Sequence, residues 1–142
     1  MANFNEHALE LSIMELFKDE GYTYLAGEQI HRERTEVLLA DDLRQYLYNR
    51  YAKDCITPSE VDGILLRLRN ISGTVYEANK AIHKLLCDGF ILNREDRMQK
   101  DLYIELIDYD NPENNIFKAV NQFEIEGVGG QLRIPDGIVF VN

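Results

Sequence analysis

A change in hydrophobic periodicity along the chain is the feature that most restricts how it can fold. In the first half, apolar residues recur at the spacing of helices that bury one face. In the last third, short apolar runs alternate with segments rich in Asn, Asp, Pro and Gly, which is typical of strands joined by turns. The sequence therefore predicts an α+β fold, with a helical first half followed by a small β-sheet.

Four helices are expected, and the last two have the clearest start signals. Each begins with a capping box, in which a threonine hydroxyl and a glutamate three residues later satisfy backbone N–H groups of the first turn. The first helix has Asn5 as a suitable N-cap. The predicted helices cover residues 6–20, residues 41–51, a segment that starts at Thr57, and a segment from Thr74 to Gly89.

Three strands are predicted, at residues 102–108, 116–126 and 136–141. The last strand is apolar on both faces, because Ile138 and Phe140 alternate with two valines. This pattern is typical of a central strand that is covered on both sides. The sequence ends at Asn142, immediately after this strand, so we expect the 142 residues to be a single domain from which part is missing.

Length and charge exclude several classes of protein. No apolar run is long enough to cross a membrane, and no secretory signal or nucleotide-binding glycine loop is present. Cys55 and Cys87 fit no metal-binding spacing, which favours a reduced, cytoplasmic protein. The formal net charge of −10 argues against a free-standing nucleic-acid binder, because phosphate attraction requires clustered Lys and Arg.

The segment from Arg133 to Gly137 is the candidate for chemistry. Pro135 places Asp136 at the start of the apolar strand, and Gly137 adds no side chain there, so a ligand or backbone could approach closely. A carboxylate in this position could bind Mg²⁺, which activates water and stabilises charge on phosphate. The alternative is an aspartate that only accepts hydrogen bonds within the turn.

Several motifs occur in order along nearly the whole chain: E-V-L-L at residues 36–39, Y-E-A-N-K-A with H-K-L-L at 76–86, I-D-Y-D-N-P-E-N-N at 107–115, V-N-Q-F at 120–123, Pro135-Asp136, and F-V-N at 140–142. This ordered set resembles the N-terminal domain of the restriction (R) subunits of type I restriction enzymes. Each motif alone is short, and the specificity comes from their number and order.

The resemblance implies an incomplete PD-(D/E)xK nuclease core, in which a helix and a mixed sheet carry carboxylates and a lysine around Mg²⁺. Asp136 would be a catalytic residue and metal ligand. A first-helix carboxylate, Glu10 or Glu6, would approach the metal, or both would be solvated on the surface. Arg133 would contact a DNA phosphate, or remain a solvated turn residue. The E-x-K half would lie on the next strand, so the 142 residues alone are predicted to be inactive. Gly137 departs from the family, which has a bulky apolar residue there.

For the parent protein, the resemblance implies a type I site-specific deoxyribonuclease. It would cleave unmodified double-stranded DNA, hydrolyse ATP in a separate motor domain, and assemble with modification and specificity subunits. Two alternatives remain: a non-catalytic module that docks a larger complex, and a stand-alone PD-(D/E)xK nuclease. An E-x-K strand and helicase motifs beyond Asn142 would distinguish them.

Overall fold

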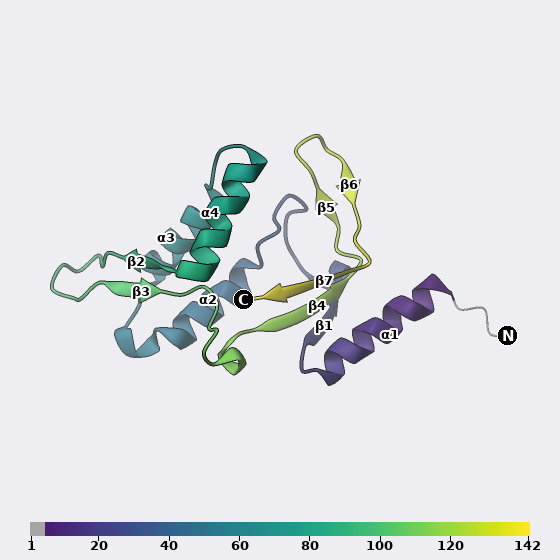
Figure 1. Ribbon diagram of the computed structural model, residues 1–142, viewed down its shortest axis with the longest axis horizontal. Coiled ribbons are helices and arrows are strands. Elements are labelled where there is room, and N and C mark those ends of the chain that lie inside the picture. Colours follow the sequence, from purple (N-terminus) through teal and green to yellow (C-terminus); the bar gives the residue numbers. More distant parts are fainter. Residues whose placement is uncertain (1–4) are drawn as a thin grey trace. The chain divides into compact units, whose positions relative to one another are not determined.

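The computed structural model describes residues 5–142, which group into two compact units (Figure 1). The first unit comprises residues 5–39 and 116–141, and the second comprises residues 40–115 with Asn142. Four α-helices occupy the first part of the chain and short strands dominate the remainder, which confirms the α+β class. The expectation of one domain cut before a further strand stays a prediction. Within residues 5–142, no helix has both the length and the apolar character required to span a membrane.

The first unit is built on a mixed three-stranded sheet with the strand order β1-β4-β7. Strands β1 (Thr23–Ala26) and β4 (Phe117–Asn121) are parallel, and β7 (Gly137–Val141) is antiparallel to β4. Asn121 lies opposite both Ala26 and Gly137. The last residues of β1 and β4 and the first residue of β7 therefore meet at one end of the sheet.

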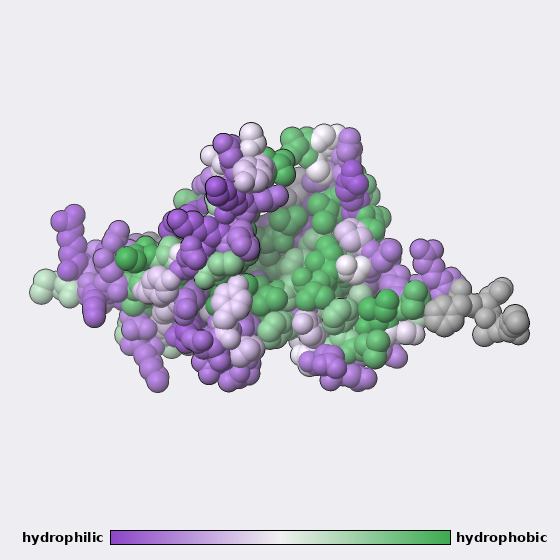
Figure 2. Space-filling view, in the orientation of Figure 1, coloured by the Kyte–Doolittle hydropathy of each residue, from purple (hydrophilic) through white to green (hydrophobic). Residues whose placement is uncertain are grey.

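Helix α1 (Glu6–Asp19) packs against β1 and β4 (Figure 1). Met14 is buried in this contact, and the ring of Phe17 lies 5.2 Å from that of Tyr22. Three other apolar residues of the predicted helix, Leu9, Ile13 and Leu16, are exposed, and hydrophobic side chains are visible on this helix in Figure 2. Helical spacing alone therefore did not identify the buried face.

Within residues 5–142, one face of strand β7 is covered and the other is exposed. It lies at the edge of the sheet, and β4 is its only neighbour within residues 5–142. Val139 and Val141 are exposed, whereas Ile138 and Phe140 pack on the core formed by Leu39, Val120 and Phe123. That β7 is central in a larger sheet, with a further strand beside it, stays a prediction.

The predicted strand 116–126 is interrupted after Asn121. Gln122 has a left-handed backbone with a φ of 52°, which turns the chain out of the sheet. The chain then forms the hairpin of β5 (Ile125–Glu126) and β6 (Leu132–Arg133).

The strand predicted at residues 102–108 is shorter in the structure. The observed strand β3 covers only Leu102–Ile104 and pairs with β2 (Phe90–Leu92). The sequence patterns did not predict β1 and β2.

The second unit contains helices α2 (Ala40–Arg50), α3 (Pro58–Arg69) and α4 (Val75–Asp88) and the β2–β3 hairpin. Both predicted capping boxes are present, at Thr57 with Glu60 and at Thr74 with Glu77. Glu60 is buried and also accepts a hydrogen bond of 2.8 Å from Arg94, so the cap of α3 is tied to the loop after β2. Short 3-10 helices cover Gly27–Gln29 (η1), Ala52–Asp54 (η2) and Pro112–Asn114 (η3).

Candidate active site

The carboxylate of Glu10 is held at the end of the sheet where β4 stops. Its Oε1 atom accepts hydrogen bonds from Asn121 Nδ2 at 2.8 Å and from Gln122 Nε2 at 3.1 Å. These bonds, the one from Gln122 above all, lower the pKa of the Glu10 carboxyl from its ordinary value. Glu6, the alternative first-helix carboxylate, is exposed in the first turn of α1. The structure thus distinguishes two glutamates that the sequence left equivalent.

Asn121 connects helix α1 to the sheet. Its side chain is buried, and its Oδ1 atom accepts a hydrogen bond of 3.0 Å from the hydroxyl of Tyr24 in β1. The ammonium group of Lys18 lies 4.7 Å from the centre of the Tyr24 ring. The amide of Asn121 is therefore oriented from β1 and presents its Nδ2 atom to Glu10.

Asp136 is exposed and directly precedes β7. The next residue, Gly137, lies opposite Asn121 in the β4–β7 register. Since Asn121 also contacts Glu10, the two predicted carboxylates belong to the same end of one sheet. Within residues 5–142, however, no group of three or more His, Cys, Asp or Glu side chains is arranged to hold a metal ion.

Gly137 makes room for another side chain of this protein. A Cβ atom at this position would lie 2.6 Å from the terminal methyl carbon of Met14. The space that the sequence analysis assigned to a close ligand or backbone is therefore occupied by the buried methionine of α1. This contact also gives a physical reason for the departure from the family's bulky residue, because a larger side chain would have to displace Met14.

Arg133 lies on β6, in the hairpin with β5, and not on the sheet that leads to Asp136. Its side chain is exposed. The structure thus places it on an accessible hairpin, and its predicted contact with DNA stays a prediction.

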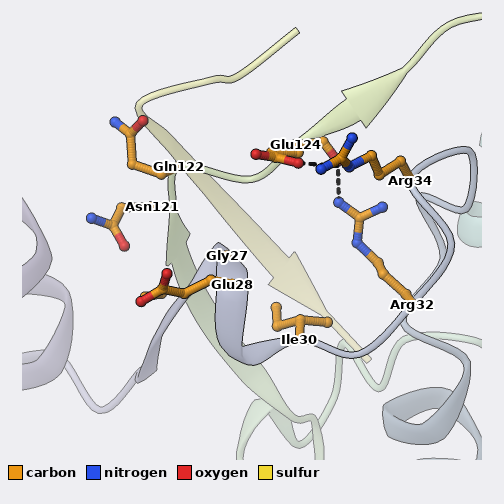
Figure 3. Close-up of a pocket in the computed structure, with 9 residues that line it drawn as sticks. Gly27, Glu28, Ile30, Arg32, Arg34, Asn121, Gln122 and Glu124 are labelled. Carbon is orange, nitrogen blue, oxygen red and sulfur yellow. Dashed lines mark hydrogen bonds and ion pairs between the residues drawn. The ribbon is translucent and has the colours of Figure 1, made fainter. Parts of the chain in front are cut away.

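A cavity of about 530 Å³ lies beside the end of the sheet where β4 stops (Figure 3). Asn121 and Gln122 line it together with η1, and Arg32, Arg34 and Glu124 line its other side. Gly27 also forms part of its wall. A Cβ atom at this position would lie 2.2 Å from the backbone oxygen of Gln122. The sequence analysis missed both arginines, since an isolated R-E-R segment carries no distinctive spacing.

Arg32 is fixed in this wall by main-chain oxygens. Its guanidinium donates to the carbonyl of Glu36 at 2.7 Å, to that of Glu33 at 3.0 Å, and to that of Glu124. It also lies 3.5 Å from the centre of the Phe123 ring. Arg34 instead forms an ion pair, with 2.7 Å between its Nε atom and Oε2 of Glu124.

The longest sequence motif, I-D-Y-D-N-P-E-N-N, forms a loop in the second unit that several of its own side chains stabilise. The buried carboxylate of Asp108 accepts hydrogen bonds from the Asn111 backbone at 2.9 Å and from Asn114 Nδ2 at 2.8 Å, and lies 3.4 Å from Arg50 NH1. The bond from Asn114 is the main reason that the pKa of Asp108 is lowered. Because donors of the loop surround this carboxylate, the motif has a structural role in the described residues.

Comparison with known proteins identifies the class to which the chain belongs. Residues 3–142 match the family described as type I restriction enzyme R protein N terminus. The chain is 30% identical to the putative type I restriction enzyme MjaIXP endonuclease subunit of Methanocaldococcus jannaschii, an alignment that covers 99% of the chain and 14% of that relative. It is 29% identical to the type I restriction enzyme HindI endonuclease subunit of Haemophilus influenzae, over 97% of the chain and 14% of the relative. No solved structure matches the chain.

Both relatives are named as endonuclease subunits of type I restriction enzymes. The chain belongs to the family of N-terminal domains of type I restriction enzyme R proteins. It spans about one seventh of the length of these curated relatives, since each alignment covers 14% of the relative.

Proposed function

We propose that this chain contributes part of the Mg²⁺-dependent nuclease site of a type I restriction enzyme, with a PD-(D/E)xK core. The supporting observation is the placement of Glu10 and Asp136 at one end of the mixed sheet. Asn121 connects them, because its side chain donates to Glu10 and its backbone lies opposite Gly137, the residue after Asp136. An aspartate at the start of a strand and a glutamate from the packing helix agree with the arrangement that the family resemblance implies.

In this proposal Asp136 is a catalytic residue and a metal ligand, and Glu10 is a second metal ligand. Carboxylate oxygens suit a hard cation such as Mg²⁺, and the hydrogen bonds of Glu10 favour its charged form. When bound, Mg²⁺ would activate water and stabilise charge on the scissile phosphate. Asn121 and Gln122 orient the Glu10 carboxylate, and Arg133 contacts a phosphate. The E-x-K residues would complete the site from outside the described segment.

The same proposal covers the parent protein. It would cleave unmodified double-stranded DNA in the cytoplasm, with ATP hydrolysed by a motor domain in another part of the polypeptide. Modification and specificity subunits would be its partners. The net charge of −10 supports a separate source of DNA affinity in the parent protein or its partners, because a chain so acidic requires other components to attract DNA.

The experiment is an Asp136→Ala substitution in the complete R subunit, assembled with its partner subunits. We expect DNA cleavage to be abolished, with ATP hydrolysis and assembly nearly unchanged, because the motor is separate. Glu10→Gln should also reduce cleavage, whereas Glu15→Gln, on an exposed position of the same helix, should not. Wild-type cleavage by Asp136→Ala would exclude a catalytic role for Asp136. Loss of assembly with both substitutions would favour a docking module instead.

A further inference from the structure

The cavity beside the carboxylates has one wall in common with the candidate active site. Asn121 and Gln122 donate to Glu10 and also line the cavity. Figure 3 shows these two residues on one side of the cavity, with Arg32 and Arg34 on the opposite side. Asn121 and Gln122 therefore link the Glu10 carboxylate to a cavity that also contains two guanidinium groups.

Arg32 supplies a fixed positive charge at this cavity. Its hydrogen bonds go to three main-chain carbonyl oxygens, which orient the guanidinium, and the charges of Glu36 and Glu124 also act on it. The face of Phe123 holds the same group from another direction. A preorganised cation of this kind attracts an anion without having to lose further side-chain freedom.

Arg34 is the more exposed cation of the cavity. Its ion pair with Glu124 is at the surface, with 59% of the arginine side chain and 41% of the glutamate side chain exposed. Exposed ion pairs contribute little free energy. A phosphate, which an arginine can bind through two parallel N–H groups, would compete effectively with this carboxylate.

We propose that this cavity binds a phosphate of the DNA backbone next to the bond that is cleaved, with Arg34 as the direct contact and Arg32 as the fixed charge. The inference rests on the proposed nuclease function and adds a substrate-positioning site to it. A volume of about 530 Å³ leaves room for the sugar attached to that phosphate. The cavity is lined by Glu28 and Glu124 as well as by the two arginines, so the phosphate would replace the Glu124 carboxylate as the partner of Arg34.

The test compares DNA binding by the complete R subunit, assembled with its partners, in Ca²⁺ in place of Mg²⁺ so that binding is measured without cleavage. Loss of one phosphate contact should lower the slope of log affinity against log salt by about 0.9. We expect this change in Arg34→Gln, with DNA binding weakened about tenfold. Arg34→Lys should retain most of the slope, because it retains the charge. Arg44→Gln is the matched control, since Arg44 forms a similar pair with Asp62 in the other unit.

Glu124→Gln provides a second, opposite variant. It removes the competing carboxylate, so we expect tighter DNA binding than in the wild type. An unchanged salt slope in Arg34→Gln, or unchanged affinity in Glu124→Gln, would overturn the inference. This result is distinct from failure of the proposed function, which is measured by cleavage in Asp136→Ala and does not affect the binding comparison.

Discussion

Asn121 Nδ2 donates a hydrogen bond of 2.8 Å to Glu10 Oε1, across 111 residues of sequence. The bond joins the end of the central strand, β4, to the helix that packs on the sheet. Because Asn121 is itself held by the Tyr24 hydroxyl, the orientation of the Glu10 carboxylate depends on three elements: α1, β1 and β4.

Asn121→Ala should therefore lower the affinity of the parent enzyme for Mg²⁺. Removal of a group that orients a metal ligand typically reduces metal affinity or activity about 10–100-fold. We expect the Mg²⁺ concentration for half-maximal cleavage to rise, as measured by titration of the complete enzyme. Tyr24→Phe, which removes only the hydrogen bond behind Asn121, should have a smaller effect. Unchanged Mg²⁺ dependence in Asn121→Ala would show that Glu10 needs no such orientation.

Gly137→Ile, which introduces a bulky apolar residue of the kind the family has at this position, should destabilise this chain. A Cβ atom at Gly137 would lie 2.6 Å from Met14 Cε, so the larger side chain must displace a buried methionine. We expect the free energy of unfolding in urea to fall by about 1 kcal/mol, because the terminal methyl of the flexible Met14 side chain can shift. In the double variant with Met14→Ala, part of this loss should be recovered, since the two side chains compete for one space. Strict additivity of the two substitutions would contradict the contact.

Gly27→Ala should be costly for a different reason. Its Cβ atom would lie 2.2 Å from the backbone oxygen of Gln122, and a backbone atom cannot rotate away as a side chain can. We expect a loss of about 1–3 kcal/mol in the free energy of unfolding. Gly63→Ala in α3 is the control: nothing lies within 4 Å of its Cβ position, so it should stabilise the protein by about 1 kcal/mol. Equal effects at both glycines would refute the close approach.

Asp108→Asn should destabilise the I-D-Y-D-N-P-E-N-N loop at neutral pH. The substitution removes the negative charge near Arg50. It also places an NH₂ group, which donates, opposite the Asn114 NH₂ group that donates to Asp108. We expect the free energy of unfolding to fall by about 2 kcal/mol. The folded-state pKa of Asp108 lies below its ordinary value of 3.8, so its contribution is present above that pH and is lost as the pH falls through the lower folded-state value. The difference between wild type and variant should therefore shrink below pH 3.8.

Urea unfolding of both proteins between pH 7 and acid measures this effect. Asp110→Asn is the control, because its carboxylate is exposed in the same loop and should be nearly neutral. A difference between wild type and Asp108→Asn that stays constant down to acid pH would show that the charge of Asp108 is not what stabilises the loop.

The starts of helices α1, α3 and α4 were predictable because each depends on neighbours in sequence. The capping threonines Thr57 and Thr74 bond to residues three positions away, and Asn5 caps α1 in the same local manner. The position of Asp136 before a strand was predictable for a similar reason, since Pro135 and the apolar run beside it restrict the same few residues.

The sequence by itself determined the α+β class, these helix starts, and, through its ordered motifs, the family. Tertiary structure decided which glutamate of α1 meets the sheet, that β7 pairs with β4, and that Arg32 and Arg34 share a cavity with Asn121. The physical reason is the range of the interactions. Caps and turns are formed by residues a few positions apart, whereas strand order and side-chain clusters depend on contacts between residues about a hundred positions apart, which no local pattern records.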